Sequence, residues 1–354
     1  MSRVSLIWPG VPLALGAAML FGASTPAAKV LLAGIDPWML AGLLYLGSGT
    51  GLGLYALARA AVGGAPAEAS IGRQDLVWLA LVVLAGGVVA PVLLMLGLSL
   101  VSASSASLLL NLEGLATMGI AWLAFHEHLD RRIFLGAMAI LLGAALLRFQ
   151  PGGLGAGWGG LAIAGACLCW GIDNNLTRKL SFSDPVHLTL IKGLAAGAVN
   201  LALARVLRHA AWPSGGVFGA ALLVGLLGYG ISLVLFTYAL RYLGTARTAA
   251  YFSTAPFIGS LIAIGFLHEP AHWEFWAASL LMAAGVAVHL IERHKHPHRH
   301  KAMTHSHRHR HDLHHQHEHG PDDPPGEPHA HAHAHEELEH THEHLPDLHH
   351  RHRH

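Results

Sequence analysis

The feature that most restricts how this chain can fold is a series of long apolar segments. Residues 76–100 form the most continuous one and contain no charged side chain. Crossing the hydrocarbon core of a bilayer takes about 20 apolar residues in a helix. Inside lipid every backbone polar group must be paired internally, which leaves helices and closed β-barrels. The segment is apolar on all sides and is much longer than the alternating strands of a barrel, which run for about 10 residues. The sequence therefore predicts a helical membrane protein.

Composition divides the chain near residue 292. Charged residues make up only 12% of the 354 residues, whereas a soluble globular protein carries about 25%. The last 63 residues contain 23 of the 30 histidines and almost no large apolar side chains. The net charge of +1 averages these two unlike regions. We therefore expect a membrane domain followed by a histidine-rich tail.

Ten segments have the length and composition of membrane-spanning helices. They are residues 11–33, 38–61, 76–98, 102–125, 132–149, 157–180, 185–207, 216–242, 246–267 and 273–291. Short connections with Pro and Gly separate them. With the N-terminus in the cytoplasm, most Lys and Arg residues of the short loops also lie in the cytoplasm, as is typical of membrane proteins. We expect an all-α membrane protein with ten transmembrane helices and both termini in the cytoplasm.

The sequence also contains an internal repeat. Residues 97–146 resemble residues 239–288 at a constant offset of 142, and the first predicted span resembles the sixth. Helices of similar composition also resemble one another, but these matches keep their order across loops. Each half then has five spans, and an odd number gives the halves opposite orientations, a construction that recurs in secondary transporters. We expect repeats at 1–149 and 150–292 and a tail at 293–354.

Two groups of motifs resemble a known family. Residues 111–113 (Asn-Leu-Glu) and 121–129 (AWLAFHEHL) resemble the first EamA repeat of the drug/metabolite transporter (DMT) superfamily. Residues 254–257 (TAPF) and 268–270 (HEP) resemble the second repeat. The resemblance covers roughly residues 11–291 and leaves the tail uncovered. It implies ten helices, alternating access and, in many members, export of small solutes, but it does not name the solute.

Ionisable residues within the predicted spans are the candidate transport residues, because charge inside a membrane is costly and usually faces a cavity or a partner. Asp173 and Lys192 lie about seven residues from the same membrane side, on consecutive spans, so we expect them at similar depth. They form either a static ion pair that fixes helix packing or part of the transport pathway. Asn174 adds to the polar edge of the same helix.

Glu113 lies about midway along the fourth predicted span and has no charged neighbour in sequence. Burial disfavours a charged carboxylate, so Glu113 is a candidate to take up a proton on one side and release it on the other. The alternative is a neutral Glu that is hydrogen-bonded to a backbone carbonyl. Asn111 and Ser107 lie on the same predicted helix as Glu113, at about one-turn spacing from each other, and we expect a shared polar face there.

Histidines alternate along the tail, so neighbouring imidazoles of an extended segment lie on one side. Neutral imidazoles are ligands for Zn²⁺, Ni²⁺, Co²⁺ and Cu²⁺. We expect the tail to bind such ions and to be disordered without them, because it has few apolar residues to bury. A purely solvating tail is the alternative. The candidate ligands are His294, His296, His298, His300, His305, His307, His309, His311, His329, His331, His333, His335, His340, His342 and His344.

Three functions fit these features. The first is a proton-coupled exporter in the bacterial inner membrane, for a small solute that is a transition-metal cation or metal complex. The second is an amino-acid or metabolite exporter whose tail buffers or senses metal. The third is a membrane-anchored metal store or sensor. The membrane domain shows no nucleophile–base pair, phosphate loop or compact catalytic metal motif, so we expect neither an enzyme nor a required cofactor. The expected partners are lipid and the solute, not nucleic acid.

Overall fold

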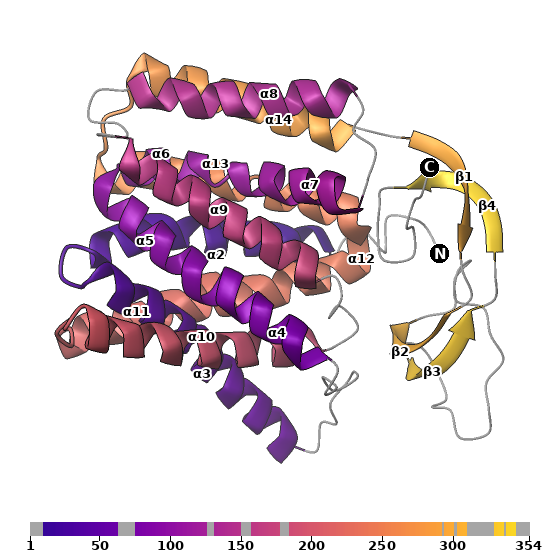
Figure 1. Cartoon of the computed structure of the whole chain (residues 1–354), viewed down its shortest axis with the longest axis horizontal. Coiled ribbons are helices and arrows are strands. Elements are labelled where there is room, and N and C mark those ends of the chain that lie inside the picture. Colours follow the sequence, from indigo (N-terminus) through magenta and orange to yellow (C-terminus); the bar gives the residue numbers. More distant parts are fainter. Residues whose placement is uncertain are drawn as a thin grey trace.

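The computed structural model describes residues 10–62, 75–125, 131–149, 157–177, 184–291, 294–300, 303–309, 329–335 and 338–344. Up to residue 291, the described residues form a bundle of helices joined by turns (Figure 1). The helices are α2 (Gly10–Leu31), α3 (Pro37–Ala61), α4 (Leu76–Val82), the π-helix η2 (Val83–Val89), α5 (Ala90–Leu100), α6 (Ala103–Leu109), α7 (Leu112–Phe125), α8 (Arg131–Leu146), the 3₁₀-helix η3 (Leu147–Phe149), α9 (Trp158–Thr177), α10 (Pro185–Leu207), α11 (Gly215–Gly225), the π-helix η4 (Leu226–Ile231), α12 (Ser232–Phe252), α13 (Ala255–Leu267) and α14 (Trp273–Ile291).

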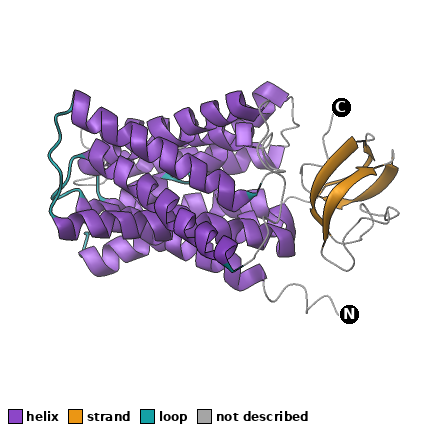
Figure 2. Ribbon diagram, turned by 90° about the horizontal axis from the view of Figure 1, so that it is seen from below, coloured by secondary structure: helices purple, strands orange, loops and turns teal. Residues whose placement is uncertain are grey.

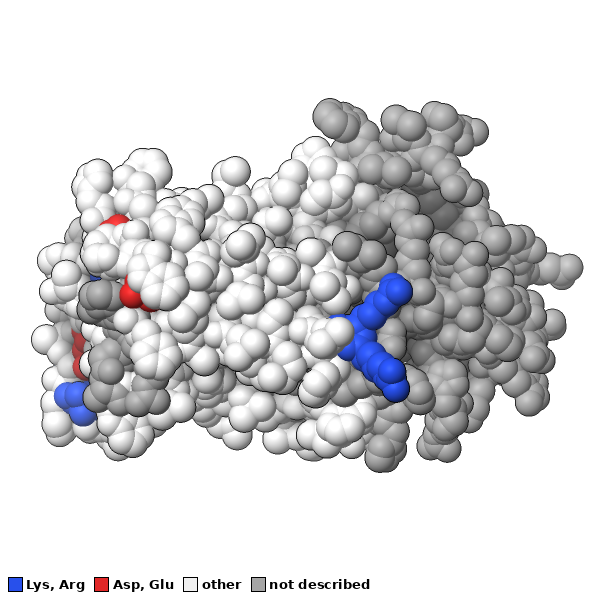
Figure 3. All heavy atoms as spheres, turned by 90° about the horizontal axis from the view of Figure 1, so that it is seen from above, with Lys and Arg blue, Asp and Glu red and all other residues white. Residues whose placement is uncertain are grey.

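The two ends of the bundle differ in what they contain. Figures 1 and 2 show the tail strands at one end of the bundle, which we call the proximal end. The opposite, distal end holds the short connections α2–α3, α5–α6, α10–α11 and α13–α14. On the face shown in Figure 3, the charged side chains of the described residues lie near these two ends. A belt of uncharged side chains separates them, as expected of a bundle surrounded by lipid.

Helical segments lie in each of the ten ranges predicted to span the membrane. Seven helical stretches of the described chain are both long enough and apolar enough to cross a bilayer. The helix α8 has only 16 residues, and the polar residues near the end of α9 lower its hydropathy. By length and composition the protein is therefore a multi-pass membrane protein, while the count of ten crossings stays a prediction.

The helix α12 contains a reversal of the chain. In a straight helix, Phe236 and Phe252 would lie about 24 Å apart at 1.5 Å per residue. Their ring centroids are 4.8 Å apart, so the chain folds back between them. This reversal lies where the sequence predicts a short connection between residues 242 and 246.

The two halves of the bundle share their irregularities. An offset of 142 residues places η2 on residues 225–231, and η4 is found at Leu226–Ile231. The same offset places the break between α6 and α7 on the break between α12 and α13. Packing is also matched, because α2 packs on α12 and α13 as α9 packs on α5 and α7, while α3 pairs with α10 and α8 with α14.

Two of these matched helices begin in the same way. The carboxylate of Asp36 accepts a hydrogen bond from the backbone N–H of Trp38 at 2.9 Å, and Pro37 is the first residue of α3. Asp184 caps α10 through the N–H of Val186 at 2.8 Å, again directly before a proline. An Asp cap satisfies a free amide, and proline lacks the amide that the first turn would leave unpaired.

The described tail segments form four strands, which differs from the expected lack of regular structure. They are β1 (His294–His300), β2 (Met303–His309), β3 (His329–His335) and β4 (Leu338–His344). β1 pairs antiparallel with β4, and β2 with β3, in registers that place His294 opposite His344 and His305 opposite His333. Alternation with a period of two matches the strand repeat, which explains the difference. The expected dependence of tail order on metal stays a prediction.

The contact between α3 and α10 requires glycine. A Cβ atom on Gly193 would lie 2.6 Å from the backbone nitrogen of Gly49. We expect Gly193→Ala to push the two helices apart and to lower the free energy of unfolding by about 1–3 kcal/mol. Thermal unfolding in detergent measures this effect. Gly265→Ala is the matched control, because a Cβ atom there meets nothing within 4 Å; equal melting temperatures for both variants would contradict the packing described.

Candidate functional site

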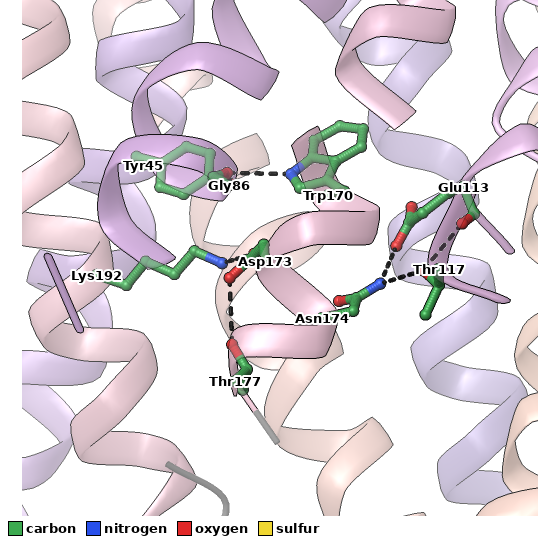
Figure 4. A network of polar contacts seen from close by, with 9 residues as sticks. All are labelled: Tyr45, Gly86, Glu113, Thr117, Trp170, Asp173, Asn174, Thr177 and Lys192. Carbon is green, nitrogen blue, oxygen red and sulfur yellow. Dashed lines mark hydrogen bonds and ion pairs between the residues drawn. The ribbon is translucent and has the colours of Figure 1, made fainter. Parts of the chain in front are cut away.

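The candidate site is built around backbone carbonyls of the π-helix η2. A π-turn disturbs the regular hydrogen-bond ladder of a helix and is frequent at functional sites. The Gly86 carbonyl accepts hydrogen bonds from the Tyr45 hydroxyl at 2.6 Å and the Trp170 indole N–H at 3.0 Å (Figure 4). The neighbouring Gly87 carbonyl accepts one from the Asn200 amide at 3.0 Å. Side chains of α3, α9 and α10 therefore converge on one irregular turn.

Next to this turn lies the ion pair that the sequence predicts. The Lys192 ammonium contacts the Asp173 carboxylate, which also accepts a hydrogen bond from the Thr177 hydroxyl at 3.2 Å. Asp173 is only 3% exposed. A Cβ atom on Gly86 would overlap the Asp173 carboxylate, so glycine at this position is what allows α9 to bring its carboxylate against η2. The predicted pairing is confirmed, while a role in transport stays a prediction.

Glu113 lies on the other side of α9 and has a polar partner. It is the second residue of α7, directly after the break that separates α6 from α7. Its carboxylate accepts a hydrogen bond from the Asn174 amide at 3.0 Å, and the same amide donates to the Thr117 hydroxyl at 3.1 Å (Figure 4). Among the described residues, no Lys, Arg or His forms an ion pair with Glu113.

The Glu113–Asn174 contact is not fully buried. The exposed apolar side chains of α9 include Leu161, Leu168 and Ile172, which mark the face that lipid would cover. Asn174 is also exposed, although at 3.6 residues per turn it projects about 200° away from Ile172. Its exposure therefore arises on the inward face of α9, beside α7. The partly buried Glu113 lies at this accessible edge.

Asn111 is not part of this network. Its side-chain amide donates to the Leu108 carbonyl at 2.8 Å and contacts the Met282 sulfur of α14 at 3.9 Å. The expectation of one polar face along a continuous helix that carries Ser107, Asn111 and Glu113 is wrong, because the helix breaks at residues 110–111. The side-chain oxygen of Ser107, on the α6 side of the break, is buried without a hydrogen-bond partner.

The structure places most of the tail histidines on its strands. Fourteen of the candidate ligands lie on β1–β4, and His311 lies outside the described residues. In the described part of the bundle there is no group of three or more His, Cys, Asp or Glu side chains that could hold a metal ion.

Sequence reasoning missed several members of the site. The π-turn makes two carbonyls available to side-chain donors, which are Tyr45, Trp170 and Asn200. Nothing in the local sequence of these donors indicates that they form these hydrogen bonds. One signal was present: Gly86-Gly87 and the Gly228-Tyr229-Gly230 segment both interrupt long apolar runs at matching positions of the repeat. Thr117, one turn after Glu113, could have been found from helical spacing.

The buried ion pair gives a direct test of its structural role. Removing one partner of a buried pair leaves an uncompensated charge and costs about 3–5 kcal/mol. We expect Lys192→Met to lower the melting temperature in detergent strongly, and Asp173→Asn combined with Lys192→Met to restore most of it. If the double variant melted as early as the single one, pairing would not explain the cost of losing Lys192.

Comparisons with known proteins agree with this architecture. The model of the EamA-like transporter family matches residues 8–149 and 157–291. An uncharacterized transporter of Methanothermobacter thermautotrophicus is 30% identical over 228 residues, which span 62% of this chain and 66% of that protein. A solved crystal structure covers 80% of this chain and 98% of its own, with a TM-score of 0.60 and 20% identity, and at that identity it supports the fold alone. The matched segments cover most of the chain, so this multi-pass membrane protein belongs to the EamA-like transporter family.

Proposed function

We propose that the protein is a proton-coupled exporter of a small solute in the bacterial inner membrane, with ten spans arranged as two inverted repeats. Two observations support the repeats: the family model matches two successive segments, and the halves share their π-helices, helix breaks and packing. Five spans per half give the halves opposite orientations, which suits transport by alternating access.

The proximal end is proposed to face the cytoplasm. The sequence segments that join helix ends there carry Arg73, Arg178 and Lys179, and the basic tail follows α14. The distal connections carry Arg208 as their only Lys or Arg. Cytoplasmic loops of membrane proteins are enriched in Lys and Arg. Both termini are then cytoplasmic, and an exported solute enters from the proximal end.

The observation that carries the coupling proposal is the contact of Glu113 with Asn174. The carboxylate lies at a break inside the bundle, has a neutral amide as its partner, and borders the accessible inward face of α9. A proton can neutralise this carboxylate without breaking an ion pair. Glu113 is therefore the proposed coupling residue, with Asn174 and Thr117 orienting it, while Asp173 and Lys192 hold α9 and α10 together around η2.

The solute is either an organic molecule or a transition metal, and the bundle and the tail favour different choices. The described bundle lacks a metal-ligand group, which favours an organic solute such as an amino acid or another metabolite, or a metal that travels as a complex. The histidine tail favours Ni²⁺, Co²⁺, Zn²⁺ or Cu²⁺, gathered at the cytoplasmic mouth. A membrane-anchored metal store or sensor is the third candidate, since the tail alone supplies its ligands.

Growth under metal stress distinguishes these functions. Cells expressing the full chain, the chain ending at Glu292, or Glu113→Gln would be grown with Ni²⁺, Co²⁺, Zn²⁺ or Cu²⁺. Metal export predicts resistance that Glu113→Gln abolishes and truncation lowers. A store predicts tolerance that survives Glu113→Gln, and metabolite export predicts no metal phenotype that depends on the bundle.

For a solute identified in this way, uptake into inverted vesicles under an imposed pH gradient tests the coupling itself. We expect Glu113→Gln to abolish gradient-driven uptake, because the side-chain amide of Gln cannot take up and release a proton as a carboxylate does. Glu274→Gln neutralises a carboxylate of α14 outside the network and is the matched control. Full gradient-driven uptake by Glu113→Gln would remove Glu113 from the coupling mechanism.

The tail is expected to bind metal in a pH-dependent manner. Imidazole binds metal in its neutral form and has an unperturbed pKa near 6.5, so protons compete with the metal as the pH falls. Calorimetric titration of the purified protein with Zn²⁺ should show binding at pH 7.5 that weakens at least tenfold at pH 5.5. The chain ending at Glu292 should show almost none; equal binding by both chains would exclude the tail as the site.

A further inference from the structure

We propose that Glu269 is a latch that holds the distal end of the bundle closed by tying its second half to its first. The proposal rests on the proposed alternating-access function. It adds that this structure is the state open towards the proximal end, and it names the contact that must break before the distal end opens.

Glu269 reaches from one half to the other. It lies in the connection between α13 and α14, and its two carboxylate oxygens accept hydrogen bonds from the backbone N–H groups of Ala103 at 2.7 Å and Ser104 at 2.8 Å. These amides belong to the first turn of α6, where no helical partner is available. Ser102 caps only the next amide, that of Ser105, at 3.2 Å. The start of α6 thus depends on a carboxylate from the other half.

The backbone before Glu269 is held in an uncommon conformation. His268 ends α13 with φ 53° and ψ 35°, in the left-handed region. For a residue with a Cβ atom this conformation is unfavourable, and it is usually taken by glycine at a helix end. The turn at His268 directs the next side chain towards α6. Strain of this kind is often found where a contact serves a function.

Two further contacts strengthen the same junction. The Ser260 hydroxyl of α13 donates to the Ser104 carbonyl at 2.9 Å, so Ser104 is held by the second half at both its N–H and its C=O. On the first half, the Lys29 ammonium donates to the carbonyls of Leu98 at 2.6 Å and Val101 at 2.7 Å. Carboxylate–amide bonds are charge-assisted and stronger than neutral ones.

The opposite end of the site is accessible. Asn174 is exposed on the inward face of α9, three residues from the last residue of that helix at the proximal end. The α6–α13 interface, by contrast, is tightly packed on the distal side of the site: a Cβ atom on Gly259 would lie 2.8 Å from the Ser107 hydroxyl oxygen. Opening of the distal end must separate α6 from α13 and expose Ser107, which is now 1% exposed.

Cysteine labelling at this position tests the latch. In a background of Cys167→Ala and Cys169→Ala, Ser107→Cys would be labelled from the distal side of sealed proteoliposomes with a membrane-impermeant maleimide. We expect Glu269→Ala to raise the labelling rate at least tenfold and Glu269→Gln to raise it less, because Gln still offers one oxygen. Asp184→Asn is the matched control: it weakens a carboxylate cap on α10, within its own half, and should leave labelling unchanged.

A second measurement covers variants that fold poorly. The pair Ser104→Cys and Ser260→Cys should cross-link readily with Glu269 present and several-fold more slowly with Glu269→Ala. Unchanged labelling and cross-linking in a monodisperse Glu269→Ala protein would overturn the latch, as would equal labelling of Asp184→Asn. Faster labelling together with full gradient-driven transport by Glu113→Gln would leave the latch standing and remove the coupling assignment.

Discussion

A carbonyl group inside a lipid-embedded bundle needs a hydrogen-bond donor, and this requirement organises the centre of the protein. Where η2 interrupts the helical ladder, the Gly86 carbonyl is covered by Tyr45 from the first half and Trp170 from the second. An unpaired polar group at that depth would cost several kcal/mol. The π-turn thereby holds α3, α9 and α10 in place, and those helices set the positions of Asp173, Lys192 and Asn174.

The two halves share this scaffold but not its chemistry. Gly86 makes room for Asp173, and at the corresponding place in the other half a Cβ atom on Gly228 would lie 2.5 Å from Ser24. The close approach of helix to π-turn is therefore repeated, whereas the carboxylate is present on one side only. Ala255 stands where Glu113 stands in the first half. The charged groups are thus a difference between the halves, on a scaffold that does not itself require them.

The sequence predicted those parts of the fold that depend on apolarity and on distance along a helix. The Asp173–Lys192 pair was predictable because both residues lie about the same number of residues from the same side of the membrane, and therefore at similar depth. The place of Asn111 was not, because helical spacing fails across the break at residues 110–111. The donors to the Gly86 carbonyl could not be predicted either, since a π-turn leaves no simple pattern in an apolar run. The tail strands arise from the alternation of His with other residues, a pattern that predicts strands as well as metal binding.

The central claim is that the two halves have opposite orientations in the membrane, and their matching Asp-Pro helix starts allow a direct measurement. Gly34, just before the Asp36 cap, lies in open space at the distal end, and His187, in the first turn after the Asp184 cap, lies at the proximal end. Single cysteines at these two positions would be labelled with an impermeant maleimide in intact cells and in inverted vesicles. The account predicts that position 34 reacts only in cells and position 187 only in inverted vesicles. Labelling of both positions from the same side would contradict it.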